Sequence, residues 1–197
     1  TRKPTICDFR PVQIEVAIAR ISDSSQNEEP VRVQRFANRV PLLFSKNGCV
    51  STEAIKSVNW RAYGLSQSKD SLPLGPYVIS VSIVSPSLKF TNAAKECIAG
   101  DIDGELYEEI RLALIQAGQK LAKYIKAESK RAELEAKRQY MEQFGPILVQ
   151  YLQKVTNCSE KDKIEAESGL KKILGREITE VAMDLKEADK KINKELK

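Results

Sequence analysis

Two stretches of the chain, residues 12–21 and 77–84, alternate between apolar and polar residues, which is the pattern of a β-strand with one buried face. The latter is also rich in the β-branched side chains that strands favour. A further strand is predicted between them, at residues 31–40, directly after residues 12–21 in the order of strands. The polar stretch before that strand, residues 22–30, is typical of an exposed hairpin loop. We therefore expect the second strand to return beside the first.

A short helix is predicted between the second and third strands. Ser51 is a residue type that caps the amino end of helices, and the helix then extends to Val58, with Ile55 on its apolar side. The helix follows a predicted turn at residues 46–48, where Asn and Gly occur together. The first half of the chain thus combines strands with a helix.

From Gly104 onward, apolar residues recur at intervals of three and four, which predicts a long helix with one apolar stripe. The stripe consists of Leu106, Ile110, Ala113, Leu114, Ala117, Leu121, Tyr124 and Ile125. Residues 126–139 keep strong helix formers but lose the stripe. This combination is typical of a helix that projects into solvent.

Beyond the projecting segment, Gly145 and Pro146 are expected to end or kink the helix. Three more apolar-faced helices are predicted after them, and Gly175 separates the last two. The order of elements predicts an α+β fold, with a mixed β-sheet and helices on one of its faces. We expect a domain of residues 1–125, a basic stalk helix of residues 126–145, and a helical extension of residues 146–197.

The composition excludes several kinds of chemistry, because the sequence contains no histidine. Histidine general bases, Ser-His-Asp and Cys-His nucleophile pairs, and histidine metal sites are ruled out. The four cysteines lie far apart, so no metal site is expected. Walker A and G-x-G-x-x-G signatures are missing, as is a carboxylate cluster for DNA cleavage. We therefore expect no cofactor in this chain and no catalysis by it alone.

The net charge and the hydropathy limit the classes of partner that we expect, and the cysteine content indicates the compartment. A formal net charge of +5, from 32 basic and 27 acidic residues, is compatible with nucleic acid without requiring it. No run of 18 apolar residues occurs, so no membrane partner is expected. Sparse, unpatterned cysteines suggest a reducing, intracellular compartment, which is the cytoplasm in a prokaryote and the nucleus in a eukaryote.

Three motifs follow one another in the chain: R-F-A-N-R-V-P-L-L at residues 35–43, W-R-A-Y at residues 60–63, and a loop with Lys95 ahead of the long helix. This order resembles the transducer domain of the B subunit of topoisomerase VI, an ATP-driven type IIB DNA topoisomerase of the GHKL ATPase family. The resemblance covers residues 9–152. It implies a GHKL transducer-like fold with a long C-terminal stalk helix, and ATP and Mg²⁺ in the intact complex.

The resemblance assigns the loop lysine, Lys95, to the γ-phosphate of ATP in a neighbouring, upstream GHKL ATPase domain. A lysine is a compact charge on a flexible stem, which suits a phosphate that comes and goes. The alternative is a solvated loop lysine without a special role. Lys89 is a competing candidate in the same loop.

The resemblance also implies that duplex DNA contacts the W-R-A-Y motif, through Trp60, Arg61 and Tyr63. Arginine can bind a phosphate with two parallel hydrogen bonds, and an aromatic ring can brace it. The alternative is that the two rings only anchor the end of the short helix to the core. Both can hold, with the rings packed inward and Arg61 facing outward.

The long helix offers two further candidate surfaces. Candidates for DNA contact are Lys123, Lys126, Lys130 and Arg131, although such a run is more often an ion-paired, solvated face. Candidates for docking on the topoisomerase A subunit are Ile147, Leu148, Tyr151 and Leu152. These apolar side chains could equally fold back on the chain's own stalk.

These assignments lead to one functional prediction with two alternatives. The chain is expected to couple ATP binding and B-subunit dimerisation to DNA gate opening and strand passage in the A subunit. One alternative is a non-ATPase scaffold of the meiotic double-strand-break machinery. The other is a basic α+β module that binds RNA.

Overall fold

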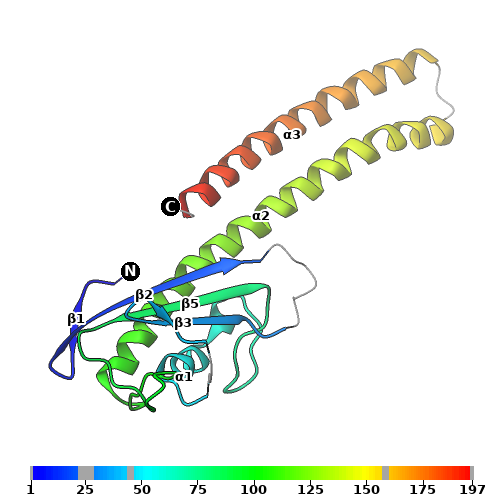
Figure 1. Cartoon of the computed structure of the whole chain (residues 1–197). Coiled ribbons are helices and arrows are strands. Elements are labelled where there is room, and N and C mark those ends of the chain that lie inside the picture. Colours follow the sequence, from blue (N-terminus) through cyan, green and yellow to red (C-terminus); the bar gives the residue numbers. More distant parts are fainter. Residues whose placement is uncertain (1, 22–28, 44–46, 157–159, 196–197) are drawn as a thin grey trace. The chain divides into compact units, whose positions relative to one another are not determined.

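The computed structural model describes residues 2–21, 29–43, 47–156 and 160–195 (Figure 1). The chain divides into two compact units, Thr1–Ala122 and Lys123–Lys197. The first unit contains a β-sheet with helices, and the second unit is helical.

A five-stranded mixed sheet forms the framework of the first unit. The strands are β1 (Thr5–Cys7), β2 (Arg10–Arg20), β3 (Arg32–Ala37), β4 (Val40–Pro41) and β5 (Tyr77–Val84), in the spatial order β1-β2-β5-β3-β4. β5 is antiparallel to β2 and parallel to β3. Every second side chain of β5 from Tyr77 to Ile83 is buried, as its pattern predicts for a sheet with one covered face.

The three longer strands predicted from the sequence are confirmed, but the predicted hairpin is wrong. β5 lies between β2 and β3, so these two strands do not pair. Alternation indicates which face of a strand is buried, and it carries no information on which strands become neighbours. The short strands β1 and β4 escape prediction, because three or two residues are too few to display an alternation.

The R-F-A-N-R-V-P-L-L run contains a tight turn between β3 and β4. Asn38 and Arg39 form this turn with φ angles of 49° and 71°, so the stretch predicted as one strand is divided in two. Asparagine tolerates the left-handed region better than most residues. Its side-chain oxygen also accepts a hydrogen bond from the backbone N–H of Ser85 at 2.9 Å. This bond fastens the turn to the end of β5.

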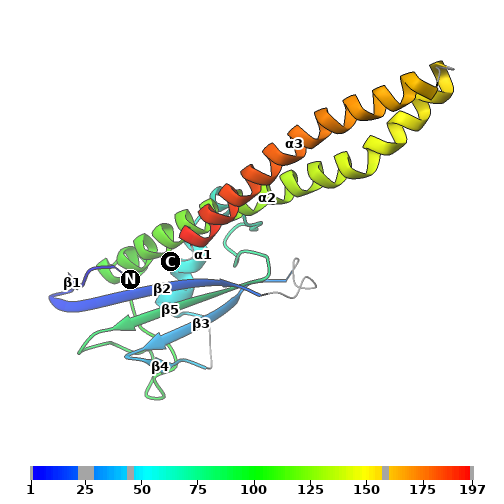
Figure 2. The ribbon, with the colours of Figure 1, turned by 90° about the horizontal axis from the view of Figure 1, so that it is seen from above.

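Helix α1 (Val50–Ser57) and the beginning of α2 (Glu105–Thr156) lie on one face of the sheet (Figure 2). The buried core of this unit includes Ile79 and Ile83 of β5, Ile55 of α1, and Ile110 and Leu114 of α2. Apolar residues three and four positions apart on α2 therefore face the sheet, as the pattern predicts. The predicted α+β fold with helices on one face is confirmed.

The predicted capping role of Ser51 is wrong. Cys49 is the N-cap residue, and no side chain caps the helix. Ser51 lies inside the first turn, where it is buried, and its hydroxyl oxygen is 3.1 Å from the Cys49 sulfur. The backbone N–H of Val50 instead donates to the carbonyl of Ile98 at 3.2 Å, which satisfies one of the N–H groups that every helix start leaves open.

The second unit consists of the remainder of α2 and of α3 (Glu160–Glu195), which returns alongside it (Figures 1 and 2). Arg131 of α2 and Asp189 of α3 form an ion pair, with 2.9 Å between Nε and Oδ1. Val181 and Ala188 of α3 are buried. None of the described helices combines the length and the apolar character that a membrane-spanning helix requires.

Gly145-Pro146 does not end the long helix, and Gly175 does not separate two helices, so both predicted breaks are wrong. A kink at Gly145-Pro146, the other form of the prediction, stays a prediction. α2 continues through Pro146 to Thr156 as one helix of 52 residues, and α3 continues through Gly175. An interior proline costs about 3 kcal/mol and a glycine about 1 kcal/mol. Helix formation is cooperative, so the residues on both sides outweigh these local costs. The division of the chain at residues 125 and 145 stays a prediction.

Candidate functional site

The segment between β5 and α2 forms a small, ordered hairpin that carries Lys95 at its tip. Phe90 and Ile98 form a β-bridge across it. The backbone N–H of Thr91 donates to the Cys97 carbonyl at 2.9 Å, and the N–H of Ala99 donates to the Lys89 carbonyl at 2.9 Å. We call residues 89–99 the Lys95 hairpin. Lys89 lies at the base of this hairpin and Lys95 at its tip. Of the two candidate lysines, Lys95 is therefore the better placed for the predicted phosphate contact.

Asn92 closes the tip of the Lys95 hairpin. Its carbonyl accepts the N–H of Lys95 at 3.1 Å, and its side-chain oxygen accepts the N–H of Glu96 at 3.1 Å. Its amide nitrogen donates to the Glu96 carboxylate at 2.9 Å. Lys95 adopts a φ of 55°, in the left-handed region that costs a side-chain-bearing residue roughly 1–2 kcal/mol. The hydrogen bonds of Asn92 therefore hold the backbone of Lys95 in this left-handed conformation.

The charged end of Lys95 is accessible. The residue is exposed, and its Nζ lies 5.9 Å from the centre of the Phe90 ring, at the outer limit of a cation–π contact. An exposed ammonium on an ordered tip fits the predicted phosphate contact. It also fits the alternative of a solvated lysine without a special role, and the geometry of the hairpin does not separate the two.

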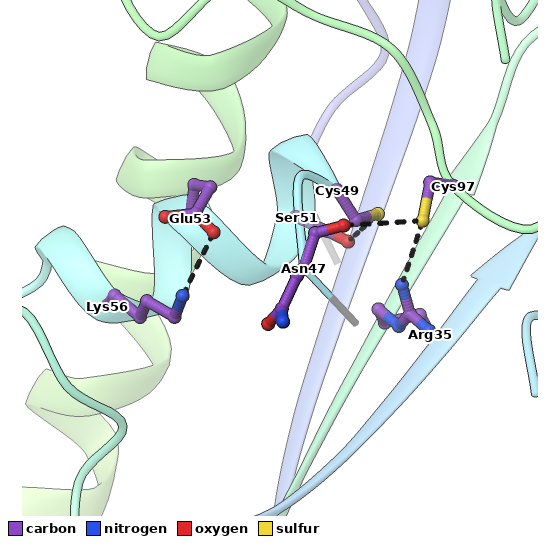
Figure 3. Close-up of polar contacts among 7 residues, drawn as sticks. All are labelled: Arg35, Asn47, Cys49, Ser51, Glu53, Lys56 and Cys97. Atoms are coloured by element: carbon purple, nitrogen blue, oxygen red, sulfur yellow. Dashed lines mark hydrogen bonds and ion pairs between the residues drawn. The ribbon is translucent and has the colours of Figure 1, made fainter. Parts of the chain in front are cut away.

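The base of the Lys95 hairpin is tied to β3 and to the start of α1 (Figure 3). Arg35 is buried, and its Nη1 lies 4.0 Å from the Cys97 sulfur, which in turn lies 3.8 Å from the Asn47 carbonyl. A side chain at Gly100 would approach Val50 to 2.9 Å, so the chain after the hairpin passes close against α1. The hairpin base and the start of α1 are therefore one packed structure.

The thiol of Cys49 belongs to the same cluster. Burial raises the pKa of this thiol, but hydrogen bonds from Ser51, Ile98 and Arg35 outweigh burial and leave the pKa below its ordinary value of 9.0. Within the described ranges, no group of three or more His, Cys, Asp or Glu residues is placed to hold a metal ion. The cluster is thus a polar anchor inside the core.

The W-R-A-Y motif forms the 3₁₀ helix η2 (Trp60–Tyr63) at the other end of α1. Trp60 is fully buried, and its indole N–H donates to the Ile55 carbonyl of α1 at 2.8 Å. Tyr63 packs edge-on against it, with 6.1 Å between the ring centres. This geometry fits the alternative in which the rings anchor the motif, and it leaves Arg61 and Ala62 exposed, of which only Arg61 carries a charge.

Arg61 is held by a residue that the motif does not contain. Its Nε donates to the backbone carbonyl of Gln67 at 2.7 Å. The Gln67 side chain accepts the N–H of Trp60 at 3.0 Å and donates to the carbonyls of Lys56 and Ser71, each at 3.0 Å. Gln67 lies in a polar loop without periodicity, so sequence reasoning gives no signal for it.

Tyr63 rests on a glycine of α2 that sequence reasoning also misses. A side-chain carbon at Gly118 would stand 2.6 Å from the Tyr63 ring, closer than packed carbon atoms approach. Gly118 interrupts a run of good helix formers, which is the only signal in the sequence. The motif is therefore packed against α2 as well as α1.

The predicted DNA-binding side chains of the stalk differ in their surroundings. Lys123, Lys126 and Lys130 are exposed, and their spacing of three and four residues places them on one face of α2. Arg131 instead pairs with Asp189 of α3. This pair agrees with the alternative of an ion-paired face at that position.

The predicted docking face on α2 is accessible in the second unit. Ile147, Leu148 and Tyr151 are 44%, 52% and 63% exposed, whereas the side chain of Leu152 lies outside the described residues. Tyr140 and Phe144 extend this face toward the amino end, and their rings stack with 4.4 Å between centres. These two aromatic residues follow the same spacing of three and four, and the sequence prediction omitted them.

Comparison with known proteins gives consistent matches. The family model described as "Topoisomerase VI B subunit, transducer" matches residues 1–137. The B subunit of type 2 DNA topoisomerase 6 from Methanosarcina acetivorans is 35% identical over 175 residues, which cover 89% of this chain and 27% of that protein. The corresponding protein from Pyrococcus furiosus is 37% identical over 151 residues, covering 77% of this chain and 25% of that protein.

The chain thus spans about a quarter of the length of these curated relatives. Among solved structures, the B-subunit of DNA gyrase from Myxococcus xanthus is 20% identical, with a TM-score of 0.39 over 60% of this chain and 33% of that chain. The fold described above rests on the strands and helices of the chain itself.

Proposed function

Because the chain belongs to the family of topoisomerase VI B-subunit transducers, we propose that it couples ATP binding to DNA gate opening in a type IIB topoisomerase. In this proposal, ATP and Mg²⁺ bind in an upstream GHKL domain, and ATP binding dimerises two B subunits. The transducer then passes the resulting conformational change to the A subunit, which cleaves duplex DNA and opens the DNA gate.

The observation that carries the proposal is the position of α1 between the two predicted sites. At its start, the N–H of Val50 is bonded to Ile98 of the Lys95 hairpin. Near its end, the carbonyl of Ile55 is bonded to the indole of Trp60. α1 has eight residues, which span about 12 Å at 1.5 Å per residue. A displacement of the hairpin base therefore reaches the W-R-A-Y motif through one short, rigid element.

In this proposal Lys95 contacts the γ-phosphate of ATP. The hairpin backbone is already fixed by its own hydrogen bonds, so binding orders only the lysine side chain and costs little conformational entropy. Release of the γ-phosphate removes the partner of the ammonium group and frees the hairpin tip. The tip can in this way distinguish a triphosphate from a diphosphate.

We further propose two partners along the rest of the chain. Duplex DNA contacts Arg61, and it contacts the face that carries Lys123, Lys126 and Lys130. The A subunit docks on the apolar face of α2 that includes Ile147. Arg131 is the least suited of the predicted DNA contacts, since its Nε is engaged by Asp189.

The test replaces Lys95 by alanine in the B subunit that contains this chain, assembled with its A subunit. We expect relaxation of supercoiled DNA to fall at least about tenfold per ATP hydrolysed, because the loss of one charge-assisted contact is of that order. Lys89→Ala, at the base of the same hairpin, is the matched control and should relax DNA normally. Normal coupling in Lys95→Ala would contradict the proposal. A wild-type complex that assembles without hydrolysing ATP would favour the scaffold alternative.

A further inference from the structure

Gln67 makes three hydrogen bonds with its side-chain amide. The oxygen accepts the N–H of Trp60, and the nitrogen donates to the carbonyls of Lys56 and Ser71. A primary amide has two N–H donors, and both are occupied. One side chain thus joins the carboxyl end of α1, the start of η2 and the loop that follows η2.

The same residue holds Arg61 through its backbone. The Gln67 carbonyl accepts the Arg61 Nε–H at 2.7 Å, a short, charge-assisted bond. The guanidinium group is planar, so fixing Nε fixes the plane in which the other N–H groups lie. Among the described residues, no carboxylate is bonded to Arg61, and the side chain is exposed. The charge is therefore oriented and still available to an anion.

We propose that Gln67 is a positioning residue that orients Arg61 toward a phosphodiester of duplex DNA. Its side chain fixes the backbone of residue 67, and that backbone fixes the guanidinium. An arginine whose plane is set before binding loses less rotamer freedom when it pairs with a phosphate. This inference rests on the proposed contact between Arg61 and DNA.

The W-R-A-Y motif alone does not contain this arrangement. Trp60 and Tyr63 pack on the core, and neither is bonded to the Arg61 guanidinium among the described contacts. The Ser68–Ser71 turn, closed by a Ser71 N–H to Ser68 carbonyl bond of 3.3 Å, supplies the carbonyl that Gln67 needs on its far side. The site for a phosphate is thus built from the motif and from the loop after it.

The experiment measures binding of the 197-residue chain to a fluorescein-labelled duplex by anisotropy, across a series of salt concentrations. The variants are Arg61→Ala, Gln67→Met and their combination. Gln34→Met is the matched control, since Gln34 lies on β3, where its side-chain oxygen accepts a hydrogen bond from Ser80. Circular dichroism and thermal unfolding check that each variant is folded.

We expect Arg61→Ala to weaken binding about tenfold and to reduce the salt slope by about one, as the loss of one phosphate contact does. Gln67→Met should weaken binding several-fold, and the double variant should bind no more weakly than Arg61→Ala. Gln34→Met should bind as the wild type does. This non-additivity separates positioning through Arg61 from a general structural effect.

Three outcomes would overturn the inference in distinguishable ways. Full affinity in Gln67→Met beside weak binding in Arg61→Ala rejects the role of Gln67 and leaves the DNA contact standing. Losses of DNA affinity that add up in the double variant mean that Gln67 affects binding independently of Arg61. Full affinity in Arg61→Ala, or preferential binding of single-stranded RNA of the same length, rejects the DNA contact itself. If Gln67→Met does not fold, Gln67→Asn takes its place, because it keeps the amide on a stem one carbon shorter.

Discussion

The Lys95 hairpin and the W-R-A-Y motif lie at the two ends of α1, and they are held in different ways. The hairpin is closed by hydrogen bonds among its own residues, from Lys89 to Ala99. The motif depends on partners in three other segments, which are Ile55, Gln67 and Gly118. The tip of the hairpin can therefore change conformation by itself, although the hairpin base is packed against the start of α1, whereas the motif changes only together with its neighbours. We therefore expect the hairpin tip to tolerate substitution and the motif to resist it.

The largest expected effect is at the motif. Trp60→Ala removes a fully buried ring and its bond to Ile55, and it should lower the free energy of unfolding by about 3–5 kcal/mol. Urea unfolding followed by circular dichroism measures the change. The matched substitution at the other end of α1, Lys95→Ala, should stay within about 0.5 kcal/mol of the wild type. Equal losses of unfolding free energy in the two variants would contradict the expected difference between the motif and the hairpin.

A smaller effect is expected where the motif meets α2. Replacing an interior helix glycine by alanine normally stabilises a protein by about 1 kcal/mol. Gly118→Ala should instead destabilise by about 1–2 kcal/mol, because the new carbon would lie 2.6 Å from the Tyr63 ring. Gly169→Ala in α3 is the control, since nothing lies within 4 Å of its added carbon, and it should be stabilising. Stabilisation by both would show that Tyr63 is free to move.

The hairpin tip offers a comparison between two variants that lose the same charge. Lys95→Gly and Lys95→Ala differ mainly in their tolerance of the φ of 55° at this position. Glycine adopts that conformation without a steric penalty, so the glycine variant should be more stable than the alanine variant by about 1 kcal/mol. Chemical unfolding of the two proteins side by side gives this difference. Identical stabilities would mean that the tip relaxes once the lysine is removed.

The smallest effect concerns pH at the hairpin base. Folding lowers the pKa of Cys49, so between that pKa and 9.0 the unfolded chain binds more protons than the folded chain. The stability of the wild type relative to Cys49→Ser should therefore increase as pH rises toward 9.0 and decrease as pH falls.

Cys7 in β1 is the matched control for the Cys49 prediction. Burial raises the pKa of Cys7 above 9.0, so its contribution is present below pH 9.0 and is lost as pH rises further. Relative to Cys7→Ser, the wild type should therefore lose stability in alkaline solution. Denaturant unfolding between about pH 7 and 10 measures the stability of the wild type relative to Cys49→Ser and relative to Cys7→Ser. The same sign of pH dependence in both would contradict the assignment of the Cys49 environment.

Periodicity was sufficient to predict β2, β5 and the apolar side of α2, because these patterns follow directly from burial of one face. Strand order is not a local property, and so the place of β5 between β2 and β3 could not be predicted. Gly145 and Pro146 do not end α2, since a long cooperative helix tolerates the cost of one proline.

The candidate site was predictable only in part, for a related reason. Lys95 and Arg61 stand in recognisable motifs, and both are exposed in the structure. Gln67 acts through the contacts of one side-chain amide and one backbone carbonyl, and Gly118 acts through a missing side chain. Neither property leaves a pattern in residue type, so the partners of Arg61 and Tyr63 emerge only once the chain is folded.

Trp60 is the only tryptophan of the chain, and it is buried where α1, η2 and the Gln67 loop meet. Its emission wavelength is therefore a natural optical reporter of this junction, without any attached label. If displacement of the Lys95 hairpin reaches the far end of α1, a red or blue shift of this single fluorophore will accompany it. The time course of that shift would order the mechanical step relative to ATP hydrolysis and strand passage.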